Sequence, residues 1–330
     1  MIPKIGITIG DVNGIGPELA LKAVQQIDFS QSIPILISPL RVLKFYSELL
    51  DLSPSIHLIK EVNDAIPNSL NVLQIDQTQR YLPEPGELTV FGGQIAMQSI
   101  QLAIDLCNAK YIDAMVTLPI SKEAVNKAGF NIPGHTEFLA EKTNASDVLM
   151  MLVNGNLRVA LATVHIPISS IVHELSVDRI IRKSTLLNES LKNDFAINSP
   201  RIALLGLNPH AGDGGVIGKE EQTIINPAIE SLNQQGIQAD GPFPADGFFG
   251  QKQYLNYDGV LAMYHDQGLA PFKALSFGKG INFSAGLPII RTSPDHGTAF
   301  NIAGTGKADP SSFLQAYNLA VELAQLNSSK

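Results

Sequence analysis

Cysteine, tryptophan and long apolar runs are scarce or absent in this sequence of 330 residues, which has one cysteine and no tryptophan. The single Cys107 excludes a disulfide within the chain, and its helical spacing from Ile100 and Ala103 favours a packed core thiol over a nucleophile. The most hydrophobic stretch, residues 148–164, is interrupted by Arg158 and cannot span a bilayer. The first residues contain no apolar segment of the length that an export signal needs. We therefore expect a cytoplasmic protein.

Positive charge is also scarce. The chain has 23 lysines and arginines and 31 aspartates and glutamates, which give a net charge of −8. Nucleic acids and anionic membranes both favour a basic surface, so we expect neither as the main partner. Apolar residues make up 45% of the chain, which is enough for sizeable cores, and the length is typical of two domains of ordinary size.

Short apolar runs alternate with helical patterns along the chain. The runs are rich in valine, isoleucine and leucine and nearly continuous, as in strands that are covered on both faces. They lie at residues 4–9, 33–38, 112–119, 148–153, 157–164, 201–206 and 259–264. Apolar helical faces lie at residues 19–27, 95–107 and 313–324. This alternation predicts an α/β fold with mostly parallel sheets.

Three of the seven histidines follow apolar runs in the same way, namely His165, His210 and His265. The carboxyl ends of parallel strands line the ligand crevice of an open α/β sheet, so these imidazoles could converge. Each alone is better explained as an unrelated loop histidine, but the recurrence of all three at one strand position favours a site. Three neutral imidazoles without a thiolate suit Zn²⁺ or another divalent ion with positions left open for substrate, which is a catalytic arrangement.

Two carboxylates, Asp266 and Asp246, are candidates for orienting such ligands, and each is equally consistent with a loop carboxylate that caps backbone N–H groups. Residues 267–294 contain three basic side chains, Lys273, Lys279 and Arg291, and no acidic one. This local excess of positive charge indicates an anionic substrate. Lys279, between two glycines, is also consistent with an ordinary loop charge.

Two glycine-rich segments do not match nucleotide motifs. Residues 6–20 predict a strand, a turn and a helix that begins near Pro17, but the third glycine of a dinucleotide fingerprint is replaced by Leu19. Residues 206–221 lack the Gly-Lys-Ser/Thr of a phosphate loop. They predict a tight loop around His210 that leads into a helix at Lys219.

A resemblance to a known family rests on seven motifs that occur in order between about residues 5 and 320: GDVNGIGPE, GHTEFLAE, ALATVHIP, GLNPHAGDGG, GPFPADGFF, YHDQGLAPFK and GINFSAGLPIIRTSPDHGTAFNIAGTGKADP. The sequence resembles the 4-hydroxythreonine-4-phosphate dehydrogenases of vitamin B6 biosynthesis. The resemblance implies two α/β/α domains, as in isocitrate and isopropylmalate dehydrogenases, with the active site in the interdomain cleft. We expect a cofactor-binding domain at residues 1–125 and 285–330, and a metal, substrate and dimerisation domain at residues 126–284.

The resemblance also implies roles for individual residues. His165, His210 and His265 match the family's ligands for a divalent metal (Zn²⁺, Mg²⁺ or Co²⁺), a set completed across a homodimer interface. The substrate-binding residues match His135, Thr136, Lys273, Asn282 and Arg291. The segment that holds the adenosine part of NAD or NADP in the relatives matches His296, Gly297, Thr298, Ala299 and Asn301, although Asp309 replaces its usual asparagine. His135, Thr136 and Asn282 carry no signal without the resemblance.

The implied reaction is the NAD(P)-dependent oxidation and decarboxylation of 4-phosphooxy-L-threonine to 3-amino-2-oxopropyl phosphate and CO₂. Lys273 and Asp246 are the candidate catalytic residues, and Lys273 is either a proton carrier or an anion contact. A sister dehydrogenase that acts on 4-phosphothreonate or 4-phosphoerythronate is the close alternative. A metal-dependent hydrolase and a non-catalytic metal- or phosphate-binding protein are disfavoured, because neither needs the dinucleotide segment.

Overall fold

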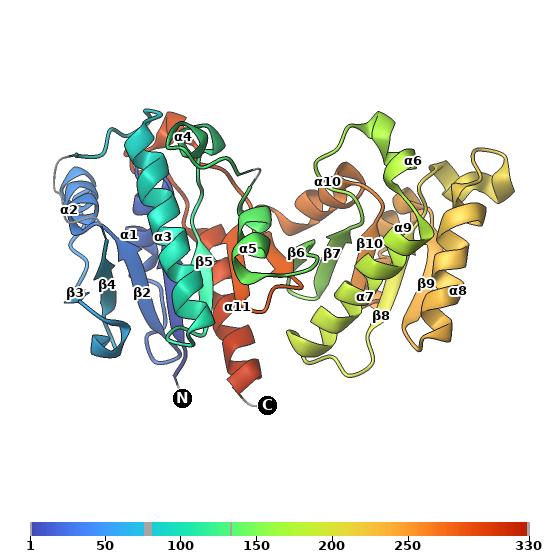
Figure 1. Cartoon of the computed structure of the whole chain (residues 1–330), viewed down its shortest axis with the longest axis horizontal. Coiled ribbons are helices and arrows are strands. Elements are labelled where there is room, and N and C mark those ends of the chain that lie inside the picture. Colours follow the sequence, from blue (N-terminus) through green and yellow to red (C-terminus); the bar gives the residue numbers. More distant parts are fainter. Residues whose placement is uncertain (1, 76–80, 133, 329–330) are drawn as a thin grey trace. The chain divides into compact units, whose positions relative to one another are not determined.

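The computed structural model describes residues 2–75, 81–132 and 134–328. The chain forms two compact units, of which unit 1 is Met1–Ser146 with Leu287–Lys330 and unit 2 is Asp147–Gly286. Figure 1 shows strands and helices alternating in both.

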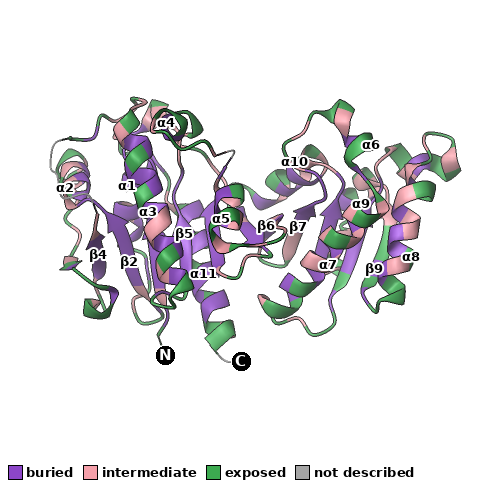
Figure 2. Ribbon diagram, in the orientation of Figure 1, coloured by how far each residue is buried: buried purple, intermediate pink, exposed green. Residues whose placement is uncertain are grey.

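Unit 1 contains a sheet whose described strands are all parallel, in the order β3-β4-β2-β1-β5-β12. Its elements are β1 (Lys4–Thr8), α1 (Gly16–Ala23), β2 (Ile33–Ser38), α2 (Leu40–Leu49), β3 (Ile56–Ile59), η1 (Val62–Asp64), β4 (Leu70–Gln74), α3 (Val90–Asn108), β5 (Ala114–Thr117), α4 (Lys122–Lys127), α5 (His135–Thr143), β12 (Ile290–Pro294), η6 (Phe300–Ile302) and α11 (Ser311–Ser328). Strands β2 and β5 are buried along nearly their whole length, as expected for strands covered on both faces (Figure 2).

Unit 2 contains strands in the order β11-β6-β7-β10-β8-β9, in which β6 is antiparallel to both neighbours and the remaining pairs are parallel. Its elements are β6 (Leu149–Asn154), β7 (Leu157–Leu161), η2 (Ile168–Ser170), α6 (Ile171–Glu174), α7 (Val177–Asn193), β8 (Arg201–Leu205), η3 (Pro209–Gly215), the π-helix η4 (Glu221–Ile225), α8 (Asn226–Gln234), β9 (Gln238–Phe243), α9 (Ala245–Gly250), η5 (Gln253–Asn256), β10 (Gly259–Ala262), α10 (His265–Ser276) and β11 (Ile281–Ala285). The predicted α/β class with mostly parallel strands is confirmed.

All seven predicted strands are present with shifts of a few residues at their ends, whereas β3, β4, β9, β11 and β12 were not predicted. These five are short or interrupted by polar residues, as in QADGPF of β9, so they lack the continuous apolar run. The helix predicted at residues 19–27 ends earlier, at Ala23. Cys107 lies on α3 and is buried in the core, and burial raises the pKa of its thiol to about 12, which confirms the packed-thiol interpretation.

The boundary between the units differs from the one expected at residue 125. Residues 126–146 belong to unit 1, because Phe138 and Leu139 of α5 pack into the same core as Ile100 and Ile104 of α3. The functions assigned to the two domains, and the expected place of the active site, stay predictions.

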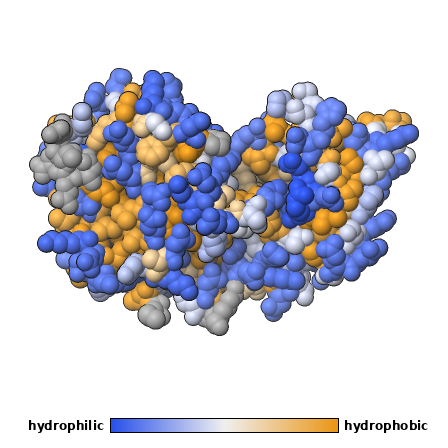
Figure 3. Space-filling model, in the orientation of Figure 1, coloured by the Kyte–Doolittle hydropathy of each residue, from blue (hydrophilic) through white to orange (hydrophobic). Residues whose placement is uncertain are grey.

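None of the described helices has the length and apolar character that crossing a membrane requires. Hydrophilic residues are spread over the face of both units drawn in Figure 3.

Candidate active site

Three neighbouring parallel strands of unit 2 deliver the three histidines named above. Strand β10 pairs with β7 on one side and with β8 on the other, with Ala262 opposite Leu161 and Gly259 opposite Ile202. His165 follows β7, His265 follows β10 and His210 follows β8. The structure therefore places all three histidines at the carboxyl edge of one sheet.

Hydrogen bonds tie the ends of these strands together just before the histidines. The backbone N–H of Ala162 donates to the carbonyl of Ala262 (2.8 Å), and the buried Thr163 hydroxyl donates to the carbonyl of Met263 (2.7 Å). Gln267 links β10 to β8, because its side chain accepts from the Met263 N–H and donates to the Gly206 carbonyl. Thr163 and Gln267 are supporting residues that the sequence analysis missed, since a single polar residue does not indicate a partner far along the chain.

The imidazoles of His165 and His265 lie close together, with their planes tilted by 41°, and both line a small cavity. Their ring centroids are 6.0 Å apart, and the cavity of about 210 Å³ is also lined by Thr163 and Tyr264. His265 Nδ1 lies 2.7 Å from Oδ1 of Asp266, which leaves Nε2 for a metal ion. A carboxylate on the second ring nitrogen is the usual arrangement around a metal-binding histidine.

His210 lies in a loop of unusual backbone conformation, described below. Within this single chain, the described residues bring no three His, Cys, Asp or Glu side chains close enough to hold a metal ion. The donor types, the placement on one sheet edge and the His265–Asp266 pair fit a divalent metal, but the His165–His265 pair needs a third ligand. A ligand set completed by a second copy of the chain would meet that need.

The other predicted residues of unit 2 occupy different elements. Asp246 is exposed in the first turn of α9, after β9, the neighbour of β8. Lys273 is exposed in the last turn of α10, eight residues after His265 and hence about 12 Å along the helix axis. Asn282 lies on β11, and its Oδ1 is buried without a hydrogen-bond partner in the described structure.

In unit 1, Arg291 lies inside the protein on β12, only 2% exposed. Its Nε and Nη2 atoms donate to the hydroxyl of Thr117, on the adjacent strand β5, over 3.0 and 2.7 Å. Burial lowers the pKa of Arg291 to about 10, against the charge of Glu137, so the guanidinium is protonated at neutral pH. The pair forms a fixed cationic group, and Thr117 is a third supporting residue that was not predicted from the sequence.

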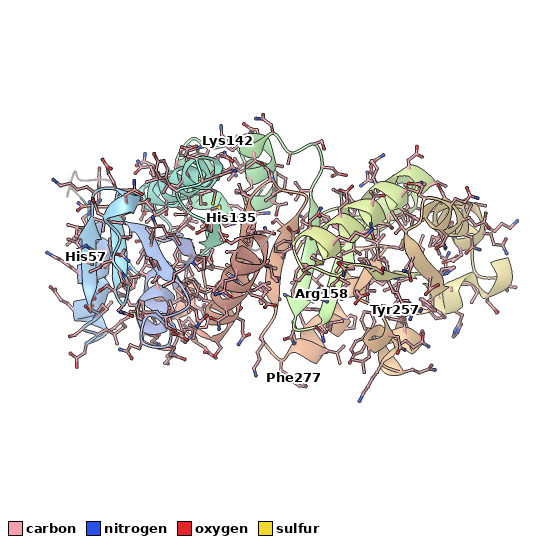
Figure 4. The ribbon with its side chains drawn as sticks, turned by 90° about the horizontal axis from the view of Figure 1, so that it is seen from below. His57, His135, Lys142, Arg158, Tyr257 and Phe277 are labelled. Carbon is pink, nitrogen blue, oxygen red and sulfur yellow. The ribbon has the colours of Figure 1, made fainter. Side chains whose placement is uncertain are left out.

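His135 begins α5, followed by Thr136 (His135 is labelled in Figure 4). Burial, and then the charges of Arg291 and Lys122, hold the pKa of His135 well below its ordinary value. The imidazole is therefore neutral at physiological pH, and its Nε2 atom is buried without a hydrogen-bond partner in the described structure. Such an atom is suited to bind a ligand, because an unsatisfied buried polar group is otherwise unfavourable.

The predicted dinucleotide segment packs against the loop that follows β1. The Ile15 N–H donates to the Thr298 carbonyl (3.0 Å), and a Cβ atom on Gly14 would lie 3.0 Å from Thr298. His296 Nε2 is buried without a partner among the described residues, and burial lowers the pKa of this histidine.

Further along the same segment, Glu18 of α1 accepts from the Ala308 N–H (2.8 Å) and pairs with Lys22 (2.8 Å). Asp309, which replaces the asparagine expected from isocitrate and isopropylmalate dehydrogenases, has a structural role here. Its Oδ1 accepts from the backbone N–H (2.9 Å) and the hydroxyl (2.6 Å) of Ser311, the first residue of α11. These bonds lower the pKa of the carboxyl group and use it to hold the start of α11.

Comparisons with known proteins identify the family of this chain. The family model described as pyridoxal phosphate biosynthetic protein PdxA matches residues 30–320. The 4-hydroxythreonine-4-phosphate dehydrogenase of Bacteroides thetaiotaomicron is 41% identical over 324 residues, covering 97% of this chain and 88% of that protein. The chain belongs to the PdxA family. The resemblance inferred from the seven motifs is thereby confirmed.

Other members of the family differ in the substrate that their names give. The crystal structure of 4-hydroxythreonine-4-phosphate dehydrogenase from Klebsiella pneumoniae has a TM-score of 0.90 at 36% identity and covers 98% of this chain and 99% of that chain. A protein of Oceanobacillus iheyensis named "Putative D-threonate 4-phosphate dehydrogenase" is 40% identical, with 98% of each chain covered. Family membership thus shows that the chain is a dehydrogenase. The names of these relatives give two different, chemically related substrates.

Proposed function

We propose that this chain is an NAD(P)-dependent and divalent-metal-dependent dehydrogenase that oxidises and decarboxylates 4-phosphooxy-L-threonine to 3-amino-2-oxopropyl phosphate and CO₂. The observation that carries the proposal is the delivery of His165, His265 and His210 from three neighbouring strand ends. A divalent ion at these imidazoles supplies Lewis-acid stabilisation of negative charge on oxygen, and a nicotinamide dinucleotide supplies the hydride acceptor.

The remaining residues bind and orient the substrate. Arg291, held by Thr117, contacts an anionic group of the substrate, and Nε2 of the neutral His135 contributes a hydrogen bond. Asn282 Oδ1, buried and without a partner in the described structure, is assigned to a substrate donor. The dinucleotide is assigned to residues 296–299 and Asn301.

Lys273 is assigned to anion contact, because it lies about 12 Å along α10 from His265 and is exposed. The variant Lys273→Arg separates the two roles, since it keeps the charge but is a poor proton carrier. An anion contact predicts a kcat close to that of the wild type, whereas a proton carrier predicts a loss of about 10²- to 10⁴-fold.

A homodimer is part of the proposal. Two loops near the histidines expose large apolar side chains, with Ile168 78% and Val216 82% exposed, beside Val172 and Ile217. Exposed apolar clusters of this kind mark interaction surfaces. A second copy of the chain that covers these loops would bring a third imidazole to the His165–His265 pair, and sedimentation or light scattering measures the oligomeric state.

A second candidate function is the oxidation of D-threonate 4-phosphate, favoured by the 40% identity to the relative that carries this name. The two substrates differ at C2, which bears an amine in one and a hydroxyl in the other. The deciding experiment measures NAD⁺ and NADP⁺ reduction with 4-phosphooxy-L-threonine beside 4-phospho-D-threonate, each with Zn²⁺, Mg²⁺ or Co²⁺. A higher kcat/KM for the amine substrate supports our proposal, and a higher value for the hydroxy acid replaces it with the second candidate.

A further inference from the structure

The loop that carries His210 has a backbone that L-residues rarely adopt. Residues 210–214 all have positive φ, with values of 54°, 50°, 81°, 44° and 64°. Three of the five, His210, Ala211 and Asp213, are not glycine. Strained conformations of this kind persist only where the surroundings determine them, and they concentrate at functional sites.

One carboxylate, that of Glu221, holds this loop from the inside. Its Oε1 atom accepts from the backbone N–H groups of Leu207 (2.8 Å) and Asn208 (2.7 Å), and its Oε2 atom accepts from the Asn208 side-chain amide (3.0 Å). On the other side of the loop, a Cβ atom added to Gly212 would lie 2.5 Å from Oε2. The carboxylate therefore fills the space between the start of the loop and its middle.

Glu221 lies at a buried position in an unusual type of helix. It is the first residue of the π-helix η4, which leads directly into α8, and its side chain is only 3% exposed (the segment runs between β8 and α8 in Figure 1). Single π-turns occur often at functional sites. A carboxylate buried to this extent is unfavourable unless it is hydrogen bonded, so its three bonds to residues 207–208 make the carboxylate and the loop depend on each other.

We propose that Glu221 is the positioning residue for His210, and that it fixes the left-handed loop so that the imidazole can bind a divalent metal ion. This inference rests on the proposed function, because it takes His210 to be a metal ligand. Glu221 itself does not touch the metal or the substrate. It acts through the backbone at residues 207–212.

The test is Co²⁺ binding to the full-length protein. A titration measures the Kd, and the visible absorption spectrum reports the coordination of the bound ion. Glu221→Gln keeps the size of the side chain but replaces one acceptor oxygen with an amino group, which cannot accept from Asn208 or the backbone. We expect the Kd for Co²⁺ to rise about 10- to 100-fold, as is typical for residues that orient metal ligands, with a changed spectrum at saturation. Glu230→Gln is the matched control, because it removes the same charge from an exposed position on α8 and should bind Co²⁺ like the wild type.

The spectrum separates positioning from simple stabilisation of the fold. If Glu221 only stabilised the fold, the folded fraction of Glu221→Gln would bind Co²⁺ with the wild-type Kd and spectrum, and this result would overturn the inference. If Glu221→Gln does not fold, Asn208→Ala takes its place, since it removes the side-chain bonds to Oε2 of Glu221 and to Oε2 of Glu220 but keeps the two backbone bonds to Oε1 of Glu221. We expect a smaller rise in Kd from that variant, and a wild-type Kd would again overturn the inference.

His210→Ala distinguishes failure of this inference from failure of the proposed function. If His210→Ala weakens Co²⁺ binding while Glu221→Gln does not, Glu221 is not a positioning residue and the metal site stands. If His210→Ala binds Co²⁺ as tightly as the wild type, the metal assignment is wrong and the inference falls with it.

Discussion

His265 Nδ1 lies 2.7 Å from Oδ1 of Asp266, the next residue of α10. This bond selects the tautomer in which Nδ1 carries the proton and Nε2 keeps its lone pair. The pair therefore leaves the in-plane lone pair of Nε2 available to a metal ion.

Removing this carboxylate should weaken metal binding. Asp266 is 81% exposed, so water replaces part of its effect in Asp266→Ala, and we expect a rise of about tenfold in the Kd for Co²⁺, the low end for such residues. Asp178→Ala is the control, because Asp178 is also exposed in the first turn of a unit 2 helix, α7. Equal Kd values for Asp266→Ala and Asp178→Ala would contradict the role given to Asp266.

The hydroxyl of Thr117 should matter for substrate binding through Arg291. Thr117→Val keeps the shape of the side chain but removes the acceptor of two guanidinium bonds. A hydrogen bond to a charged group contributes about 1.5–3 kcal/mol, so we expect the KM for the phosphorylated substrate to rise at least about tenfold. Steady-state kinetics should show recovery in Thr117→Ser. A normal KM in folded Thr117→Val would show that Arg291 needs no such support.

Close packing between Gly14 and Thr298 predicts an effect on dinucleotide binding. A Cβ atom at residue 14 would lie 3.0 Å from Thr298, so Gly14→Ala should displace the segment that begins at His296. Overpacking of about 1 kcal/mol corresponds to a roughly fivefold rise in the KM for NAD⁺ or NADP⁺. Gly247→Ala, where a Cβ atom meets open space in unit 2, should leave this KM unchanged. The dinucleotide assignment is wrong if both variants behave alike.

Asp11 predicts a pH-dependent contribution to stability. This carboxyl group is 0% exposed, and burial raises its pKa from 3.8 to about 6, against the bond from the Asn13 N–H. Because the pKa is higher in the folded state, that state binds more protons between these two values. The contribution of Asp11 to the free energy of unfolding therefore falls as the pH rises through this window. The fall is complete above about pH 6.

The variant Asp11→Asn does not titrate. The difference in free energy of unfolding, Asp11→Asn minus wild type, should therefore increase with pH. We expect an increase of up to about 3 kcal/mol between about pH 4 and about pH 8. Urea unfolding at both pH values measures this difference. Asp105→Asn, at an exposed position of α3, is the control and should show a much smaller change. A flat difference for Asp11→Asn would mean that the carboxyl group is hydrated in the folded protein.

Part of this architecture follows from local sequence, and part does not. The strands that precede His165, His210 and His265 are nearly continuous apolar runs, so their ends, and the common sheet edge, are predictable. Strand β9 has a polar sequence and is paired with β8. Sheet pairing of this kind is a tertiary effect that a local pattern does not contain.

The supporting residues of the site were beyond prediction for a related reason. Glu221 and Gln267 lie beside other polar residues, and their partners, Asn208 and Gly206, lie 13 and 61 positions away in the chain. Nothing in their immediate sequence distinguishes them from solvent-exposed side chains. The resemblance to a family identified His135, whereas only the structure revealed its buried Nε2 atom.

The central claim is that a divalent ion bound by His165, His210 and His265 is required for dinucleotide reduction. The most direct measurement is the rate of NADH or NADPH formation from 4-phosphooxy-L-threonine by protein stripped of metal with a chelator, before and after Co²⁺ is restored. Loss of several kcal/mol of transition-state stabilisation predicts a fall of at least about 100-fold on stripping, with recovery in the wild type and none in His210→Ala. Near-normal turnover by the stripped protein would contradict the account.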